Sequence, residues 1–308
     1  MSEVYIIGHK SPDTDSICAA IAYANLKRVT GENSAAKAAR AGEINPETEF
    51  VLNRFGVEAP ELLENAAGKK LILVDHNEFA QMVDGAEEAE ILEVLDHHRI
   101  EFKWANPILF HTEPVGSTST LVAEKYFEKG IELDEKMAGI MLAAILSDTV
   151  VFKSPTSTDR DKEVAEKLAK IVGVDPQKFG VEVKKAKASL EGKSAKDIIR
   201  SDFKDYTFGG KKVGVGQVEI VDIEEARSRK QEILDEMRRM TAEEGYDMVF
   251  MMLTDIIQEG TELLVVGDED GAVTRKAFNA ELNDNSVYIE GMMSRKKQVI
   301  PPLEKTMS

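Results

Sequence analysis

The chain has 308 residues, of which 43% are hydrophobic and 31% charged, a balance typical of a folded soluble protein. Its formal net charge of −17 argues against a nonspecific nucleic-acid binder, because an acidic surface repels phosphate backbones. No run reaches the ~18 apolar residues that cross a membrane, and no basic segment precedes the short apolar stretch at the N-terminus. The single cysteine, Cys18, excludes an internal disulfide framework and favours a reducing compartment, so we expect a cytoplasmic protein.

The first half of the chain alternates short apolar runs with amphipathic stretches, which is the pattern of βαβ units and a parallel sheet. The apolar runs predict strands, and the stretches with helical spacing and good helix formers predict helices. The expected strands are 4–7, 71–74 and 91–95, and the expected helices are 16–28, 137–146 and 159–172.

The polar, glycine-bearing segment SLEGKS, residues 189–194, is the predicted domain boundary. We expect a catalytic domain over 1–188, a linker at about 189–193 and a second domain over 194–308. The fold prediction is therefore α/β, with an N-terminal parallel-sheet domain and a smaller C-terminal mixed-sheet domain. In the second domain the expected strands are 213–221, 248–254, 263–267 and 287–290, with one long helix over 223–244.

Four short motifs in the first half place Asp and His directly after an apolar run, and they contain four of the five histidines. In an open parallel sheet the carboxyl ends of the strands share one edge, where ligands bind. Three strand ends and one helix end should therefore bring these side chains together. The motifs are GHKSPDTD at 8–15, VDHN at 74–77, LDHH at 95–98 and LSDT at 146–149.

Each motif alone is a weak signal. An Asp at this place is often a helix cap, which is an alternative for Asp15, and an isolated His9 is more often a partly buried histidine than a ligand. We interpret His76 and His111 as ordinary packed histidines. The ordered combination HxxxDxD, D, DHH and SD is much more specific than any of its parts.

The charges of the motifs match two divalent metal ions. Four aspartates carry four negative charges, and without metal they would repel one another and raise their pKa values. Neutral imidazoles from His9 and His97 add nitrogen donors, a mixture that favours Mn²⁺, Co²⁺ or Zn²⁺ over Mg²⁺. The four aspartates are Asp13, Asp15, Asp75 and Asp148.

Two such ions about 3.5–4 Å apart share a water and lower its pKa, which suits attack on a phosphoryl group. The charge of that substrate needs cations, and the segment Ser294–Gln298, SRKKQ, offers them. The alternative for this segment is a solvated basic turn ahead of the Pro-Pro stop at 301–302.

These motifs resemble the DHH phosphoesterases, and SRKKQ resembles the DHHA2 domain of family II inorganic pyrophosphatases. The resemblance runs from Ile7 to Pro301. Related exonucleases and oligonucleotide phosphatases carry a glycine-rich GGGH-like motif in a different second domain. Here Gly209-Gly210 is followed by two lysines, so the sequence departs from that branch.

The resemblance implies hydrolysis of inorganic diphosphate, with two Mn²⁺ per subunit, Co²⁺ as a substitute and Mg²⁺ accompanying the substrate. It also implies a homodimer formed through the N-terminal domain. The implied roles are as follows: His9 and Asp13 bind one metal; Asp15, His97 and Asp148 bind the other; Asp75 bridges both; His98 faces the substrate; Asp96 orients the ligands; and Lys204, Arg295 and Lys296 bind diphosphate.

Two alternatives stay open. One is a short-chain polyphosphatase or nucleotide phosphoesterase of the prune-like branch, which shares the second domain type. The other is a non-catalytic phosphate-binding or metal-storage protein, which the complete ligand set disfavours. Since the predicted cations follow residue 200 and the predicted ligands precede residue 150, we expect both domains to be needed for turnover.

Overall fold

The computed structural model of the chain describes residues 3–188, 190 and 192–307. Two compact units make up the chain, residues 1–187 and residues 188–308. The predicted linker, 189–193, includes residues 189 and 191, which lie outside the described residues. The domain bounds drawn from the sequence stay a prediction.

The first unit contains a six-stranded sheet in the order β3-β2-β1-β4-β5-β6, and every neighbouring pair of strands is parallel. β1, β4 and β5, which carry the three strand-end motifs, are therefore direct neighbours. The strands are β1 (Val4–Ile7), β2 (Ala36–Arg40), β3 (Glu61–Leu62), β4 (Lys70–Val74), β5 (Glu90–Asp96) and β6 (Leu109–Thr112).

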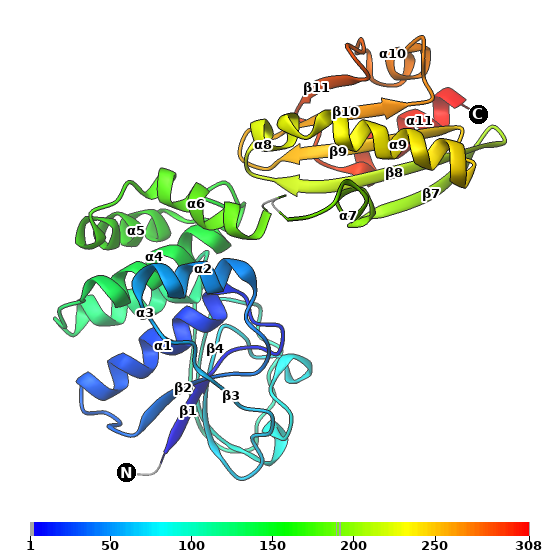
Figure 1. Ribbon diagram of the computed structural model, residues 1–308. Coiled ribbons are helices and arrows are strands. Elements are labelled where there is room, and N and C mark those ends of the chain that lie inside the picture. Colours follow the sequence, from blue (N-terminus) through cyan, green and yellow to red (C-terminus); the bar gives the residue numbers. More distant parts are fainter. Residues whose placement is uncertain (1–2, 189, 191, 308) are drawn as a thin grey trace. The chain divides into compact units, whose positions relative to one another are not determined.

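Helices lie on one side of this sheet, and loops with two short 3₁₀ turns pack on the other (Figure 1). Gly8 shows how closely a helix approaches the strand ends, because a Cβ there would lie 1.8 Å from Ser16 Oγ. The first turn of α1 can thus lie directly over the end of β1. The helices are α1 (Thr14–Val29), α2 (Pro46–Phe55), α3 (Thr118–Glu128), α4 (Glu135–Asp148), α5 (Asp159–Val172) and α6 (Pro176–Ala188).

The second unit contains a mixed five-stranded sheet in the order β11-β10-β9-β8-β7, with β8 and β9 parallel and the other pairs antiparallel. Alternate residues of the fully buried β9 face two different cores. Val249 and Met251 pack toward α7, α8 and α9, whereas Phe250 and Met252 pack toward α10 and α11. The strands are β7 (Phe203–Phe208), β8 (Lys211–Ile220), β9 (Met248–Asp255), β10 (Gly260–Val266) and β11 (Ser286–Glu290), and the helices are α7 (Ala195–Arg200), α8 (Ile223–Ser228), α9 (Lys230–Glu244), α10 (Ala272–Phe278) and α11 (Ile300–Met307).

The predicted α/β class, with a parallel sheet followed by a mixed one, is confirmed. The single helix expected over 223–244 is wrong, because α8 ends at Ser228 and α9 begins at Lys230. The break lies at Arg229, whose guanidinium donates to the Leu190 carbonyl (2.7 Å) and to Glu232. A contact with a residue 39 positions away thus overrides the local helical pattern.

The prediction that Pro301 and Pro302 act as a stop after SRKKQ is also wrong. Arg295–Val299 forms a π-helical turn that continues directly into α11, and the two prolines lie in the first turn of α11. The fixed φ of proline, near −65°, is compatible with a helix, so the two prolines at this junction do not stop the chain from continuing as α11.

Of the helices that the structure describes, none has both the length and the apolar character required to span a bilayer.

Candidate metal centre

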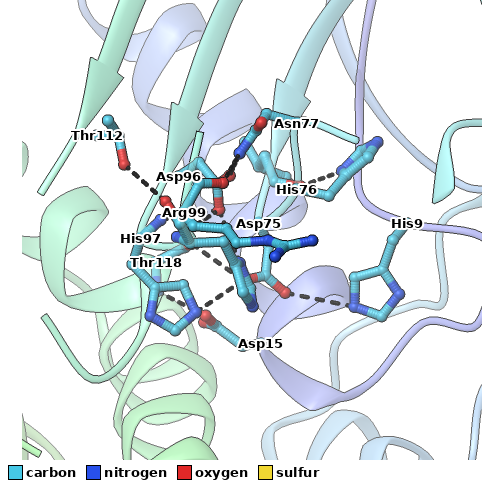
Figure 2. A network of polar contacts seen from close by, with 12 residues as sticks. His9, Asp15, Asp75, His76, Asn77, Asp96, His97, Arg99, Thr112 and Thr118 are labelled. Atoms are coloured by element: carbon cyan, nitrogen blue, oxygen red, sulfur yellow. Dashed lines mark hydrogen bonds and ion pairs between the residues drawn. The ribbon is translucent and has the colours of Figure 1, made fainter. Parts of the chain in front are cut away.

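The four predicted motifs meet at the carboxyl edge of the first sheet. Asp and His side chains from the ends of β1, β4, β5 and α4 form overlapping groups in which one ligand atom of each residue lies within 4.8 Å of the others. Figure 2 shows Asp75 between His9 on one side and His97 and Asp15 on the other. The groups are His9, Asp13 and Asp75; Asp15, Asp75, His97 and Asp148; and Asp75, His97 and His98.

Asp75 belongs to every group, and its two carboxylate oxygens point in different directions. Oδ2 lies 3.5 Å from His9 Nε2, whereas Oδ1 lies 3.3 Å from His97 Nε2. The residue is 1% exposed and has a left-handed backbone, with φ of 63°. Aspartate tolerates this conformation better than most residues do. The turn at the end of β4 therefore holds the carboxylate between two groups of donors.

Asp13 and Asp148 contribute carboxylates from helix ends to two of the groups. Asp13 Oδ2 lies 3.6 Å from His9 Nε2, and its Oδ1 accepts a hydrogen bond from the Ser16 N–H at the start of α1 (2.9 Å). Asp148, the last residue of α4, places Oδ2 3.8 Å from His97 Nε2. Asp13 is thus a helix cap as well as a member of the cluster.

Asp15 belongs to the first turn of α1, but its carboxylate lies at the N-terminus of α3. Its carboxylate accepts hydrogen bonds from the backbone N–H groups of Thr118 (2.6 Å) and Ser119 (3.0 Å), at the positive end of the helix dipole. The Thr118 hydroxyl donates to Asp75 Oδ1 (3.0 Å). Asp161 holds the loop before α3 by accepting from the Gly116 N–H (2.9 Å). The helix-cap alternative for Asp15 does not apply to α1, because Asp13 is the N-cap of that helix.

His97 has a defined orientation. Its Nδ1 lies 2.9 Å from the Val115 carbonyl, so this nitrogen carries a proton, and Nε2 is the nitrogen that can act as a ligand once it is deprotonated. Within the described part of the chain, His97 Nε2 and Asp75 Oδ2 are buried and have no hydrogen-bond partner. Buried polar atoms without partners are rare in folded proteins, and here a metal ion would satisfy both.

The pKa values show what metal would displace. Burial lowers the pKa of His9, but the carboxylates of Asp13 and Asp75 outweigh it and raise that pKa to about 10. In the same way Asp75 raises the pKa of His97 to about 10 against the effect of burial. Burial, followed by the charge of Asp75, raises the pKa of Asp15 to about 7. Without metal, protons therefore balance part of the carboxylate charge, and the donor set fits divalent cations that would take their place.

The Asp96 side chain holds the two histidines of the DHH segment by hydrogen bonds. Its Oδ1 accepts from the backbone N–H of His97 (2.8 Å) and lies 2.9 Å from His98 Nδ1, and its Oδ2 accepts from the Asn77 amide (2.6 Å). The contact between Asn77 and Asp96 is visible in Figure 2. The His98 side chain is 52% exposed, and the hydrogen bond to Asp96 raises its pKa. His98 thus presents Nε2 to solvent beside the cluster.

The other two histidines have packing partners. His76 is buried, with Nδ1 2.8 Å from the Val74 carbonyl, and burial lowers its pKa to about 4. His111 lies between Glu113 (2.7 Å) and Lys125 (3.0 Å). Neither belongs to the groups of possible metal ligands found among the described residues.

The three predicted diphosphate-binding cations line one cavity of about 540 Å³ in the second unit. Lys204 and Lys296 are exposed there, and no described residue forms an ion pair with either ammonium. Arg295 is different, because it is 7% exposed and its Nη2 donates to both carboxylate oxygens of Asp202 (2.7 and 2.9 Å). It also donates to the Asp202 carbonyl (2.6 Å). Arg295 therefore anchors the π-helical turn, and its predicted contact with diphosphate stays a prediction.

Several residues that support the centre carry no motif signal. Thr118 and Ser119 supply N–H donors, Val115 supplies a carbonyl, and Asp161 holds their loop. The only signal in the sequence is GSTS at 116–119, a helix-capping composition that precedes α3. A left-handed turn also follows Asp148, in which Val150, Val151 and Phe152 have φ values of 48°, 54° and 65°.

Comparison with known proteins gives the family. The DHH family N-terminal domain matches residues 3–145, and the DHHA2 domain matches residues 181–306. The manganese-dependent inorganic pyrophosphatase of Methanothrix thermoacetophila is 52% identical over 305 residues, covering 98% of this chain and 97% of its own. That of Bacillus subtilis is 43% identical over 311 residues, covering 100% of both chains.

A solved structure agrees with this. A Methanococcus jannaschii protein assigned to the family II inorganic pyrophosphatases superposes with a TM-score of 0.62 at 47% identity, covering 99% of both chains. The DHH domain thus precedes the DHHA2 domain, as the DHH and SRKKQ motifs indicate, and the similarity extends over the full chain. The chain therefore belongs to the family II, manganese-dependent inorganic pyrophosphatases, which combine a DHH domain with a DHHA2 domain.

Proposed function

We propose that this chain hydrolyses inorganic diphosphate to two phosphates at a centre of two divalent ions, with manganese as the preferred metal. The observation that carries the proposal is the shared carboxylate of Asp75, whose two oxygens face separate sets of donors. The names of the relatives support the substrate and the metal. When bound, such ions would lower the pKa of a shared water and supply a hydroxide for attack on phosphorus.

The proposed ligand sets follow the group with His9 and Asp13 and the group with Asp15, His97 and Asp148. His9 and Asp13 hold one ion, Asp15, His97 and Asp148 hold the other, and Asp75 contacts both. The imidazoles bind through Nε2, the atom that each directs toward Asp75. Two nitrogen donors among the carboxylates favour Mn²⁺ or Co²⁺ over Mg²⁺, which we propose accompanies the substrate.

His98 is the proposed contact to the substrate from the first unit. Asp96 holds its Nδ1 and raises the pKa of the ring, which favours the protonated form whose Nε2–H can donate to a phosphate oxygen. Lys204, Lys296 and Arg295 are the proposed contacts from the second unit. Lys204 and Lys296 have charges that no described residue balances by an ion pair, and diphosphate needs such cations because the charge of the two ions is largely offset by the aspartates.

Phosphate release from diphosphate tests the proposal. Protein stripped with a chelator should be inactive, should recover with Mn²⁺ or Co²⁺ plus Mg²⁺, and should recover poorly with Mg²⁺ alone. Tripolyphosphate and cyclic nucleotides in parallel assays separate the pyrophosphatase from a prune-like phosphoesterase. Full activity with Mg²⁺ alone would contradict the two-histidine site, and faster turnover of the other substrates would contradict the specificity.

We also propose a cytoplasmic homodimer. The edge strand β6 supports self-association, because Leu109 on it is 56% exposed and Ile100 in the preceding loop is 62% exposed. Buried Cys18 is consistent with a reducing compartment. Sedimentation velocity would show a species of twice the chain mass, and a monomer at micromolar concentration would contradict the dimer.

A further inference from the structure

A buried polar cluster connects two of the segments that carry the proposed metal ligands. Glu47, in the first turn of α2, is 2% exposed. Its Oε1 accepts hydrogen bonds from the hydroxyls of Thr14 (2.7 Å) and Ser147. Thr14 lies between two of the proposed ligands, and Ser147 directly precedes Asp148. One carboxylate thus joins the start of α1 to the end of α4.

Lys184 on α6 completes the cluster. Its Nζ lies 3.2 Å from Glu47 Oε2 and donates to Ser147 Oγ at 3.2 Å. A buried carboxylate is costly unless it is paired and hydrogen-bonded, and Lys184 supplies the charge. The Ser147 hydroxyl donates to Glu47 and accepts from Lys184, so its direction is fixed from both sides.

The same face of α6 touches the chain on the other side of Asp148. Gly180 precedes Lys184 by four residues, which places both on one face of the helix. A Cβ on Gly180 would lie 2.9 Å from Val151 Cγ2, so no larger residue fits there without a shift. α6 therefore contacts residue 147 before Asp148 and residue 151 after it.

We infer that Glu47 and Lys184 are positioning residues that set the spacing between the aspartates of α1 and Asp148 of α4. The inference rests on the proposed metal centre, because positioning has a purpose only if these carboxylates share ions. Crowded carboxylates repel one another, and a hydrogen-bonded pair behind them keeps the two helix ends at one separation. Partners that orient metal ligands typically contribute 10–100-fold to metal affinity.

Four full-length variants test the inference: Glu47→Gln, Glu47→Ala, Lys184→Met and the control Glu49→Gln. Glu49 lies on the same turn of α2 but is exposed. Affinity for Mn²⁺ is measured on chelator-stripped protein by competition with a chromophoric chelator, and thermal unfolding of the metal-free protein is recorded alongside. We expect Glu47→Ala and Lys184→Met to bind Mn²⁺ about 10–100-fold more weakly. Glu47→Gln should lose less, because its amide oxygen still accepts from both hydroxyls, and Glu49→Gln should match the wild type.

The outcomes separate the possible failures. A lower unfolding temperature with unchanged Mn²⁺ affinity in Glu47→Gln and Lys184→Met would show a purely structural pair and overturn the inference. If Glu47→Ala does not fold, these two milder variants still decide the question. Wild-type protein that binds no Mn²⁺ would instead refute the proposed function. A fall in affinity that follows the order Ala, Met, Gln, control supports the positioning role.

Discussion

The proposed metal centre of the first unit and the basic cavity of the second unit differ in how their charged groups are held. At the centre, nearly every carboxylate or imidazole has a defined partner, such as the α3 N–H groups for Asp15 and the Val115 carbonyl for His97. In the cavity, Lys204 and Lys296 are exposed and have no ion-pair partner among the described residues. Changes at the crowded centre should therefore disrupt several groups together, whereas changes in the cavity should act separately and by smaller factors.

Asp75→Asn is the strongest test of this difference. Asparagine tolerates the left-handed backbone at position 75, so the variant should fold. An amide bridges two cations poorly, however, and one of the balancing charges is lost. We expect one metal to be lost and turnover to fall by more than about 100-fold, since even indirect metal partners contribute 10–100-fold. Metal content and phosphate release measure this, and near-normal activity with two bound ions would exclude Asp75 from the centre.

The pH dependence of metal binding sharpens the comparison. His9 and His97, with pKa values raised to about 10, are protonated near neutral pH in the metal-free protein and must lose those protons to bind metal. Affinity for Mn²⁺ should therefore rise with pH below about 10, by about tenfold per pH unit for each proton released. Calorimetry in buffers of different ionisation enthalpy counts these protons. Binding without proton release would show that the imidazoles are already neutral.

Lys296→Ala should have a smaller and separable effect. Removing one exposed ammonium from the cavity should weaken diphosphate binding by about tenfold, the scale of one charge-assisted contact. Metal content and unfolding temperature should not change. Lys297→Ala is the matched control, because Lys297 is also exposed but does not line this cavity. Equal KM values for the two variants would show that position 296 has no special role.

Arg295→Ala should lower stability in addition to weakening the proposed contact with diphosphate. Removing its bonds to Asp202 frees the π-helical turn, but Asp202 is 54% exposed and can be solvated, so the cost should be about 1–2 kcal/mol. Urea unfolding measures it, with Lys296→Ala as the comparison. A variant of unchanged stability that loses diphosphate binding would show that Arg295 contacts the substrate directly.

The sequence predicts the metal centre better than it predicts the second unit. β1 has the predicted bounds, β4 begins one residue earlier than predicted, and β5 is one residue longer at each end, because buried parallel strands read as short apolar runs. Once these three strands are neighbours, their Asp and His residues must meet. In contrast, the break at Arg229 and the anchoring of Arg295 depend on contacts across 39 and 93 residues. No local pattern encodes such contacts.

The supporting residues of the centre show the same limit. Glu47 resembles any acidic residue in the first turn of a helix, where it would favour the dipole. Its burial between Thr14, Ser147 and Lys184 follows only from the packing of α1, α2, α4 and α6. Sequence patterns identify residue types that are unexpected at their position, whereas the unusual property of Glu47 is its burial, which only the folded structure reveals.

In the left-handed turn after Asp148, residues that usually destabilise regular structure can be more stable than those that usually favour it. Three successive residues with positive φ, two of them valines, each cost roughly 1–2 kcal/mol relative to a right-handed turn. At Val150 the residues that usually weaken regular structure, glycine and asparagine, suit the backbone better than valine does. Val151 cannot follow this rule, since its side chain fills the space that Gly180 leaves open. Two adjacent positions of the same left-handed turn should thus tolerate different replacements, because the backbone conformation limits position 150 and the packing of the side chain limits position 151.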